Sequence, residues 1–337
     1  MTLKLPIIRP AKPEDLGKLV EFSQESGYGV TSLPRSSAVL EKRLYASTAA
    51  FQEKFILPTH ETYQFCLEWE GNVIGTSCIV SRVGMTETFY AYHLLFEPHV
   101  CTYLNVDTRQ PVLHFTRARK KPTEIGSLFL SKFFRHKDFG KLLSLCRFLF
   151  IATFRNRFAP MVIAELRGIN RDGYAPFWEA IGRVFFQIDF VKADLLRMEH
   201  HACIEDLFPK HPLYLHMLPI EAQNVLGVTH GDTVPAQKML EKQGFKMSHY
   251  FDLFDGGPHV YSPTDEIHAV RESREIVIDS LKPHLQQNKH AFICNTRLEF
   301  RATLAPLFIE NGRAVLHPEV AAQLLVQPGD TIRYYFY

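Results

Sequence analysis

The segment SLFLSKFFRHKDFGKLLSLCRFLFIATF, residues 127–154, decides the fold. A short apolar strand at 127–130 leads into a basic loop at 135–141, and apolar residues then recur with helical spacing over 141–154. Such a turn directs backbone N–H groups and the positive end of a helix towards one point, where phosphate is the usual ligand. The segment predicts a phosphate site, although an ordinary βα turn with basic residues in solvent fits the loop alone at least as well.

Other known phosphate motifs do not match this sequence. It contains neither the GxxxxGK[ST] pattern of a P-loop nor the GxGxxG pattern of a dinucleotide-binding turn. A nucleotide held in either of those two ways is therefore not expected. The order of the flanking elements has to decide what the loop at 135–141 binds.

The flanking sequence predicts an α/β fold. Upstream, the hydrophobic pattern gives a strand, two amphipathic helices, a β-hairpin and a further strand with a loop, over about 7–10, 11–26, 39–51, 63–68, 73–83 and 93–106. Downstream it gives strand, helix, strand, helix and strand, over 161–166, 176–181, 185–190, 236–243 and 245–254. Gly244 is a suitable C-cap for the last of these helices.

The character of the sequence changes after about residue 265. Short strand patterns, several of them separated by Pro and Gly, follow one another up to residue 336. A length of 337 residues suits two domains, or one enlarged domain with a small appendage. We therefore expect an α/β domain over 1–264, with a mixed central sheet flanked by helices, and a small β-rich domain over 265–337.

Composition and charge exclude several classes of function. The net charge of +2 gives no reason to expect nucleic acid as a partner. No run of about 18 apolar residues is present, so no membrane span is expected. The six cysteines form no CxxC pair and no zinc-like cluster with histidine, which predicts reduced thiols, no metal site and a cytoplasmic protein.

The order of the elements resembles the GNAT superfamily of acyl-CoA N-acyltransferases. Its members hold CoA on a loop of pattern [RQ]-x-x-G-x-[GA] before a long helix, and here Arg135 and Gly140 match the first and last positions. Lys141 adds a cation beside them, and the strand ending at Leu130 corresponds to the one whose N–H meets the thioester oxygen. Asp138 stands where the pattern has its first glycine and brings a carboxylate near the phosphate.

A closer resemblance covers nearly the whole chain. It rests on six stretches in order: GVTSLP at 29–34, LFL at 128–130, GKLLS at 140–144, AELRG at 164–168, GYAPFW at 173–178 and FDLFDGGP at 251–258. Together they are similar to the bacterial arginine N-succinyltransferase family of arginine catabolism. The resemblance implies transfer of succinyl from the co-substrate succinyl-CoA to the α-amine of L-arginine, with no permanently bound cofactor and a small C-terminal β domain.

Two residues carry over from that family. His230, in VTHGD at 228–232, matches the family's proton donor, and Leu128 matches a succinyl-CoA contact. Histidine suits proton transfer because its unperturbed pKa is about 6.5, and such help is worth roughly 10²–10⁴-fold in rate. Without the resemblance, His230 is one of 16 histidines, and a place on a surface loop would explain it better.

Candidate residues for the acceptor follow from the chemistry of arginine. A guanidinium pairs with carboxylates, and an α-carboxylate pairs with an arginine or with backbone N–H groups. Glu165 and Arg167 stand two residues apart on one expected strand and so share a face, which suits either an acceptor site or an ion pair at the strand edge. Thr31 and Ser32 are candidate hydroxyl donors to substrate, and capping of a turn explains them equally well.

Two further interpretations stay open. The same chemistry fits ornithine or another amino-acid acceptor, because the sequence does not define the pocket. A non-catalytic partner subunit would also keep the fold; Asp138 favours that interpretation, whereas His230, Glu165 and the central strand favour an active enzyme. The expected partners are L-arginine, succinyl-CoA and either further copies of the chain, as a homo-oligomer, or a related subunit.

Overall fold

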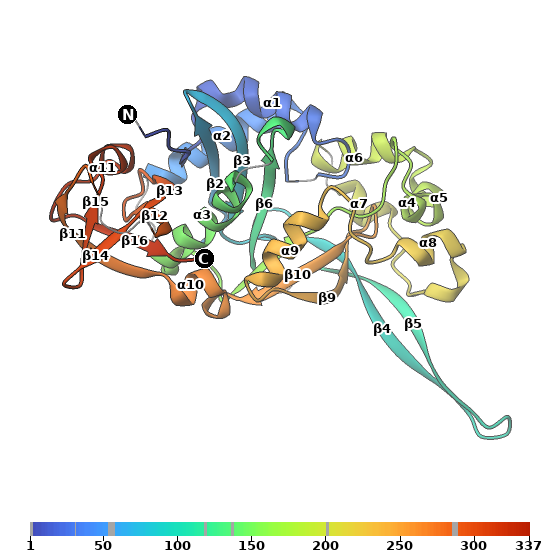
Figure 1. Ribbon diagram of the computed structural model, residues 1–337. Helices are drawn as coiled ribbons and strands as arrows, with labels where there is room; N and C mark the ends of the chain where they lie inside the picture. The colour runs from blue at the N-terminus through green and yellow to red at the C-terminus, as the bar shows by residue number, and fades with distance from the viewer. Residues whose placement is uncertain are drawn as a thin grey trace.

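The computed structural model describes residues 3–30, 32–52, 58–117, 120–135, 138–199, 202–284 and 289–337. Its described strands form one 16-stranded sheet in the order β14-β15-β11-β16-β12-β13-β1-β2-β3-β6-β7-β10-β9-β4-β5-β8. Most neighbours are antiparallel, but β6 and β7 run parallel near the centre. This mixed sheet with helices packed against it confirms the expected α/β class (Figure 1).

The N-terminal elements follow the hydrophobic pattern of the sequence. They are β1 (Ile7–Pro10), α1 (Leu16–Glu25), α2 (Ser37–Gln52), β2 (Thr62–Trp69) and β3 (Asn72–Val80). Apolar residues of α1 and α2 pack with Cys66 and Phe129, which lie on one face of the sheet. The two helices therefore cover that face, which we call the α2 side.

The opposite face of the sheet is covered by α3 (Phe139–Thr153). Its apolar residues pack against Phe65 of β2 and Ile125 of β6 (Thr123–Leu130), in a core that Phe51 at the end of α2 also joins. Also on this side, α9 (Val234–Lys242) contributes the buried Leu240 to the same core. We call this face the α3 side.

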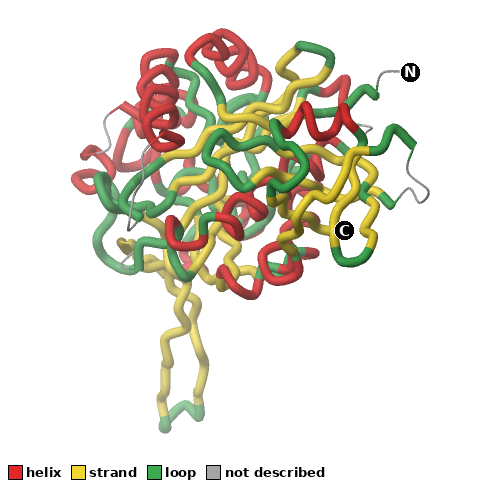
Figure 2. The backbone as a smooth tube through the Cα atoms, turned by 90° about the vertical axis from the view of Figure 1, so that its left-hand side faces the viewer, coloured by secondary structure: helices red, strands yellow, loops and turns green. Residues whose placement is uncertain are grey.

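A long β-hairpin projects from the body of the protein. It consists of β4 (Tyr90–Cys101) and β5 (Val106–Arg117), which pair over their full length, and its base is joined by β8 (Leu213–Tyr214) and β9 (Lys246–Phe251). Figures 1 and 2 show the hairpin extending well beyond the other elements. The sequence indicated only a strand and a loop here, because the outer half of the hairpin buries too little apolar surface to show a clear alternation.

Five short helices follow β7 (Met161–Glu165): α4 (Pro176–Ala180), α5 (Gly182–Phe186), α6 (Phe190–Glu199), α7 (Ala202–Leu207) and α8 (Ile220–Val225). They enclose a second apolar cluster around Trp178 and Phe208. The strand expected at 185–190 is wrong, because two helices meet there. Gln187 ends α5 in a left-handed conformation, and the carboxylate of Asp189 accepts the N–H of Lys192 in the first turn of α6.

The chain then returns to the sheet through β9 and β10 (Pro258–Pro263), followed by α10 (His268–Glu272). The C-terminal elements are β11 (Arg274–Leu281), β12 (His290–Asn295), β13 (Ala302–Pro306), β14 (Phe308–Glu310), β15 (Arg313–Leu316), α11 (Pro318–Leu324) and β16 (Thr331–Tyr335). They hold an apolar cluster of their own, yet β13 pairs with β1 and so extends the central sheet. The boundary at 264 and 265 stays a prediction.

No helix within the described residues is long and apolar enough to cross a membrane.

Candidate functional site

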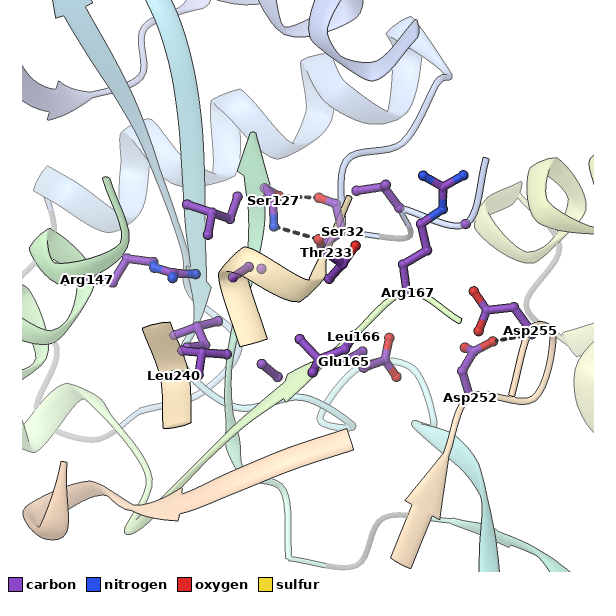
Figure 3. Close-up of a pocket in the computed structure, with 17 residues that line it drawn as sticks. Ser32, Ser127, Arg147, Glu165, Leu166, Arg167, Thr233, Leu240, Asp252 and Asp255 are labelled. Carbon is purple, nitrogen blue, oxygen red and sulfur yellow. Dashed lines mark hydrogen bonds between the residues drawn. The ribbon is translucent and has the colours of Figure 1, made fainter. Parts of the chain in front are cut away.

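The central feature of the site is a split between the parallel strands β6 and β7. They pair only at Thr123↔Val162 and Glu124↔Ile163, near their amino-terminal ends. Farther along, residues 125–128 of β6 and 164–167 of the β7 segment line a cavity of about 110 Å³ (Figure 3). The strands therefore diverge towards their carboxyl ends and leave a cleft through the middle of the sheet.

A bulge in β6 shapes the wall of this cleft. Ser127 and Leu128 both lie opposite the single residue Ser77 of β3, and Ser127 has a φ of 50°. The N–H of Ser127 donates to Oγ of Ser32 over 2.6 Å, and its hydroxyl donates to the carbonyl of Ser32. Ser32 thus holds the bulge, and the backbone of Leu128 is turned out of the regular ladder. Thr31 lies outside the described residues.

Gly126 allows Ser32 to approach the bulge of β6 closely. A Cβ at Gly126 would stand 2.6 Å from Cβ of Ser32 and 2.8 Å from its Oγ, so any larger residue would push the 32–33 segment away. The side chain of Arg43 also donates to the carbonyl of Ser32. The segment that follows α1 is therefore fixed directly over the bulge.

On the α2 side, the cleft continues into a larger cavity of about 440 Å³. Ser32, Gly126, Glu165 and Asp252 line both cavities. Glu124 and Glu165 point into this larger space from neighbouring strands, because the β6–β7 register places them on one face of the sheet. The α2 side therefore presents two carboxylates to anything that enters it.

Glu165 raises the proton affinity of Glu124. Burial, and then the nearby charge of Glu165, raise the pKa of Glu124 to about 8, although Arg43, Arg197 and His60 act in the opposite direction. Beside them, Nε2 of His259 lies 3.3 Å from Oε1 of Glu165, and burial lowers the pKa of His259 to about 4. The histidine beside Glu165 is therefore neutral near pH 7, and Arg197 is the nearby cation whose charge acts on both Glu124 and Glu165.

The stretch FDLFDGGP at 251–258 fixes the end of β7. The carboxylate of Asp255 accepts the N–H of Gly168 over 2.8 Å and the N–H of Gly257 over 2.8 Å. Asp252 accepts the N–H groups of Phe254 and Asp255 and pairs with Nη1 of Arg197 at 3.2 Å. This buried network holds the β7 segment away from β6 and so keeps the cleft open.

Arg167 and His230 meet at the mouth of the cleft. The N–H of His230 donates to the carbonyl of Arg167 over 2.8 Å, and Thr233 of the same turn lines the cavity. The guanidinium of Arg167 donates to the carbonyl of Ser26 and, over 2.8 Å, to Oδ1 of Asn170. Arg167 and Glu165 both line the cleft, but their side chains turn to different partners (Figure 3).

The protonation of His230 follows from its contacts. The N–H of Asp232 donates to Nδ1 of His230 over 3.2 Å, which in the neutral ring leaves the proton on Nε2. Burial, and then the charge of Arg167, lower the pKa of His230 below its usual value. The neutral imidazole with an Nε2–H group is therefore the form favoured near pH 7.

The basic loop lies at the end of β6. Nε of Arg135 donates to the carbonyl of Leu130 over 3.0 Å. A Cβ added at Gly140 would lie 3.8 Å from the side chain of Leu130. Asp138 precedes α3 and pairs with Nζ of Lys141 at 2.9 Å. The carboxylate that replaces the expected glycine is thus bound to a lysine of the same turn, which reduces its repulsion of a phosphate.

The structure brings several of the residues proposed from the sequence close together. Leu128, Glu165, Arg167 and Ser32 line the cleft, while Leu130, Arg135, Gly140 and Lys141 gather at the adjoining start of α3. Sequence reasoning missed Glu124, His259, Arg197, Asp252 and Arg147 as residues of the site. Among these residues, only Arg147 had a signal in the sequence, because it places a charge in the middle of a mostly apolar helix. In the described part of the chain, no group of three or more His, Cys, Asp or Glu side chains is arranged to hold a metal.

A mixed sheet split between two parallel strands, with a bulge at the split and a loop leading into a helix beside it, defines the GNAT-like class of acyl-CoA N-acyltransferases. Comparison with known proteins gives the family. The sequence-family model of the arginine N-succinyltransferase beta subunit matches residues 6–269, and the family model of its C-terminal domain matches residues 274–335. The chain belongs to the arginine N-succinyltransferase family.

Individual relatives agree with the family assignment. The arginine N-succinyltransferases of Escherichia coli strain 55989 and of Salmonella schwarzengrund are each 36% identical over 333 residues, which cover 97% of this chain and 96% of theirs. Among solved structures, arginine/ornithine succinyltransferase subunit AI from Pseudomonas aeruginosa is similar, with a TM-score of 0.91, 28% identity and 99% of each chain covered. The expected family and fold are therefore confirmed.

Proposed function

We propose that this protein is an arginine N-succinyltransferase, which transfers succinyl from succinyl-CoA to the α-amine of L-arginine. The observation that carries the proposal is the cleft between β6 and β7, which joins the α3 side to a cavity containing two carboxylates. A direct transfer needs the acyl donor and the amine to meet at one point, and Ser32 and Gly126, which lie at the bulge of β6, line both cavities.

The acceptor enters from the α2 side. Glu124 and Glu165 supply charge for the guanidinium, and binding of that cation favours the ionised form of both. Arg167, at the mouth of the cleft, is the proposed partner of the α-carboxylate, since its pKa is lowered by burial and its pairing with an anion would offset that cost. Ser32 offers its hydroxyl hydrogen at the junction, and Thr31 remains a prediction.

The donor enters from the α3 side. Leu128, which lines the cleft, is the proposed contact of the acyl end of succinyl-CoA, and Leu130 lies where its strand ends. The start of α3, with Arg135, Gly140 and Lys141 around it, is the proposed place of the CoA phosphates. No permanently bound cofactor is required for this reaction.

The chemistry is a single displacement at the thioester. The neutral α-amine attacks the carbonyl carbon, a C–N bond forms, and the carbonyl electron pair moves to oxygen, where the N–H of Leu128 is the proposed donor. Collapse of that intermediate breaks the C–S bond, the amide nitrogen loses its proton, and the sulfur takes one up. His230, with its proton on Nε2, is the proposed donor to the sulfur.

Two alternatives have specific support. The relative from Pseudomonas aeruginosa is named for arginine and ornithine, so ornithine is the second candidate acceptor. That relative and the family model both refer to subunits, which supports an assembly of further copies or with a related chain. A cytoplasmic location is consistent with six free cysteines.

The test is a thiol-release assay with succinyl-CoA and acetyl-CoA against arginine, ornithine and lysine. Release that is selective for succinyl-CoA and arginine is expected. Selective release with ornithine would move the function to that acceptor. Folded protein that releases no CoA with any pair would contradict the proposal and favour a subunit that needs a partner.

A further inference from the structure

Arg147 is a buried cation that lines the cleft on the α3 side. Its side chain belongs to the middle of α3, and the residue is only 2% exposed. Nε donates to the carbonyl of Ser144 over 3.1 Å, and Nη2 donates to Oγ of Ser144 over 3.0 Å. Because both partners are neutral groups of its own helix, the charge of Arg147 is not balanced by these contacts.

Two other arginines with little-exposed side chains, Arg9 and Arg197, are balanced by carboxylates. Arg9 pairs with Asp15 at 2.7 Å, and Arg197 pairs with Asp252 at 3.2 Å. Among the residues that the structure describes, no carboxylate forms an ion pair with Arg147. Burial lowers the pKa of Arg147 to about 10. A guanidinium in such a place is costly for the fold unless an anion joins it.

The position of Arg147 indicates which kind of anion would bind to it. Arg147 follows Phe139, the first residue of α3, by eight positions, so it lies about 12 Å along the helix axis from the end that suits phosphates. The cavity beside it has a volume of about 110 Å³, against the roughly 300–1,000 Å³ of pockets for drug-sized ligands. Its neighbouring walls include the apolar side chains of Ile125, Ala164 and Leu240.

A short apolar chain that ends in a negative charge fits this description. Figure 3 shows Arg147 pointing from α3 towards the middle of the cleft, with Glu165 and Asp252 on the far side. An anion bound at Arg147 would therefore lie across the cavity from Glu165 and Asp252, which line its far wall. An acyl group held at Leu128 would reach Arg147 with its distal end while its thioester carbonyl stayed at the bulge.

We propose that Arg147 binds the distal carboxylate of the acyl group and so selects a dicarboxylic acyl-CoA over a neutral one. The planar guanidinium offers a carboxylate two parallel hydrogen bonds, which a lysine cannot reproduce. Arg147 takes no part in bond making; it determines donor specificity and positions the thioester. The inference rests on the proposed function only in assuming that an acyl-CoA binds at Leu128.

The test measures binding of succinyl-CoA and butyryl-CoA by isothermal titration calorimetry, with no acceptor present. The wild-type protein should bind succinyl-CoA at least ~10-fold more tightly than butyryl-CoA, because only the former carries the charge. Arg147→Met should abolish this preference and leave the affinity for butyryl-CoA unchanged. Arg147→Lys, which keeps the charge without the planar group, should retain a reduced preference.

Arg157→Met is the matched control. Arg157 is also buried, at 6% exposure, but it lines neither cavity. Its Nη1 donates to the hydroxyl of Tyr63 over 3.0 Å. This variant should keep the full preference for succinyl-CoA. If Arg147→Met does not fold, a full preference in Arg147→Lys overturns the inference and a reduced one supports it.

The inference and the proposed function can fail separately. A wild-type protein without preference, or an Arg147→Met protein that keeps it or loses affinity for both donors equally, overturns the role of Arg147. A protein that prefers succinyl-CoA through Arg147 but releases no CoA with arginine upholds that role and contradicts the proposed acceptor.

Discussion

The two sides of the split sheet differ in charge and in size. On the α2 side, Glu124 and Glu165 face a cavity of about 440 Å³, and the histidine next to them is neutral. On the α3 side, Arg147 faces a cavity of about 110 Å³ whose walls include the apolar Ile125, Ala164 and Leu240, with Glu165 and Asp252 on its far side. Under the proposed function, a cation and a short anionic chain bind on opposite sides of one cleft and meet where Ser32 holds the bulge of β6. Such a division would keep two charged substrates apart until they react.

The largest effect is expected where the two sides meet. His230→Ala should lower kcat roughly 10²–10⁴-fold, because the leaving sulfur loses its proposed proton donor. Neither substrate should bind much less tightly, since His230 lies outside both cavity walls. Steady-state kinetics of CoA release measure this, with His216→Ala, an exposed histidine, as the control. An unchanged kcat would remove His230 from the mechanism.

Glu165→Gln should affect the acceptor and spare the donor. Hydrogen bonds to charged groups are worth about 1.5–3 kcal/mol, so kcat/KM for arginine should fall roughly 10- to 150-fold. The KM for succinyl-CoA should stay as in the wild type. Glu310→Gln, at an exposed carboxylate of β14, is the control. An unchanged KM for arginine would show that Glu165 is not part of the acceptor site.

The affinity for arginine should depend on pH through Glu124. Its pKa of about 8 in the empty protein means that a proton must leave before the guanidinium can pair with both carboxylates. The Kd for arginine should therefore fall about tenfold per pH unit from pH 6 towards pH 8 and then level off. Calorimetry in buffers of different ionisation enthalpy should detect one proton released. Glu124→Gln should remove both effects, and a Kd independent of pH in the wild type would contradict them.

The smallest effect concerns stability. The folded-state pKa of Glu124 lies above the usual value of a glutamate, so its contribution to stability is complete below about pH 4 and is lost as pH rises towards 8. Glu124→Gln mimics the protonated form at every pH. The variant and the wild type should have equal Tm at pH 4, and the variant should have the higher Tm at pH 8, by about 2 °C or more. A lower Tm for the variant at pH 8 would mean that Glu124 is paired in the folded protein.

Elements with strong hydrophobic periodicity were predictable from the sequence. The strand, loop and helix over 127–154 appear as β6, the basic loop and α3, and both N-terminal helices lie where their apolar residues recur. The strand expected at 185–190 failed because its aromatic residues fit a helical cluster as well as a sheet. The hairpin arm was only partly visible, because Tyr103 at its tip is 94% exposed and no burial pattern marks it.

The site residues were predictable only where a family resemblance or the chemistry of the residue type pointed to them. His230 and Leu128 came from resemblance, and Glu165 and Arg167 came from their spacing on a strand. Glu124 lies 41 positions before Glu165, and only the parallel register of β6 and β7 brings the two together. The meaning of Arg147 depends on the lack of an acidic partner within the described residues, which no sequence pattern encodes.

The central claim is that the two sides of the cleft serve different substrates. Its most direct test is the pair of KM values, for arginine and for succinyl-CoA, in Glu165→Gln and in Arg147→Met. Glu165→Gln should raise only the KM for arginine, and Arg147→Met should raise only the KM for succinyl-CoA. Variants that raise both KM values to the same extent would contradict the division of the cleft.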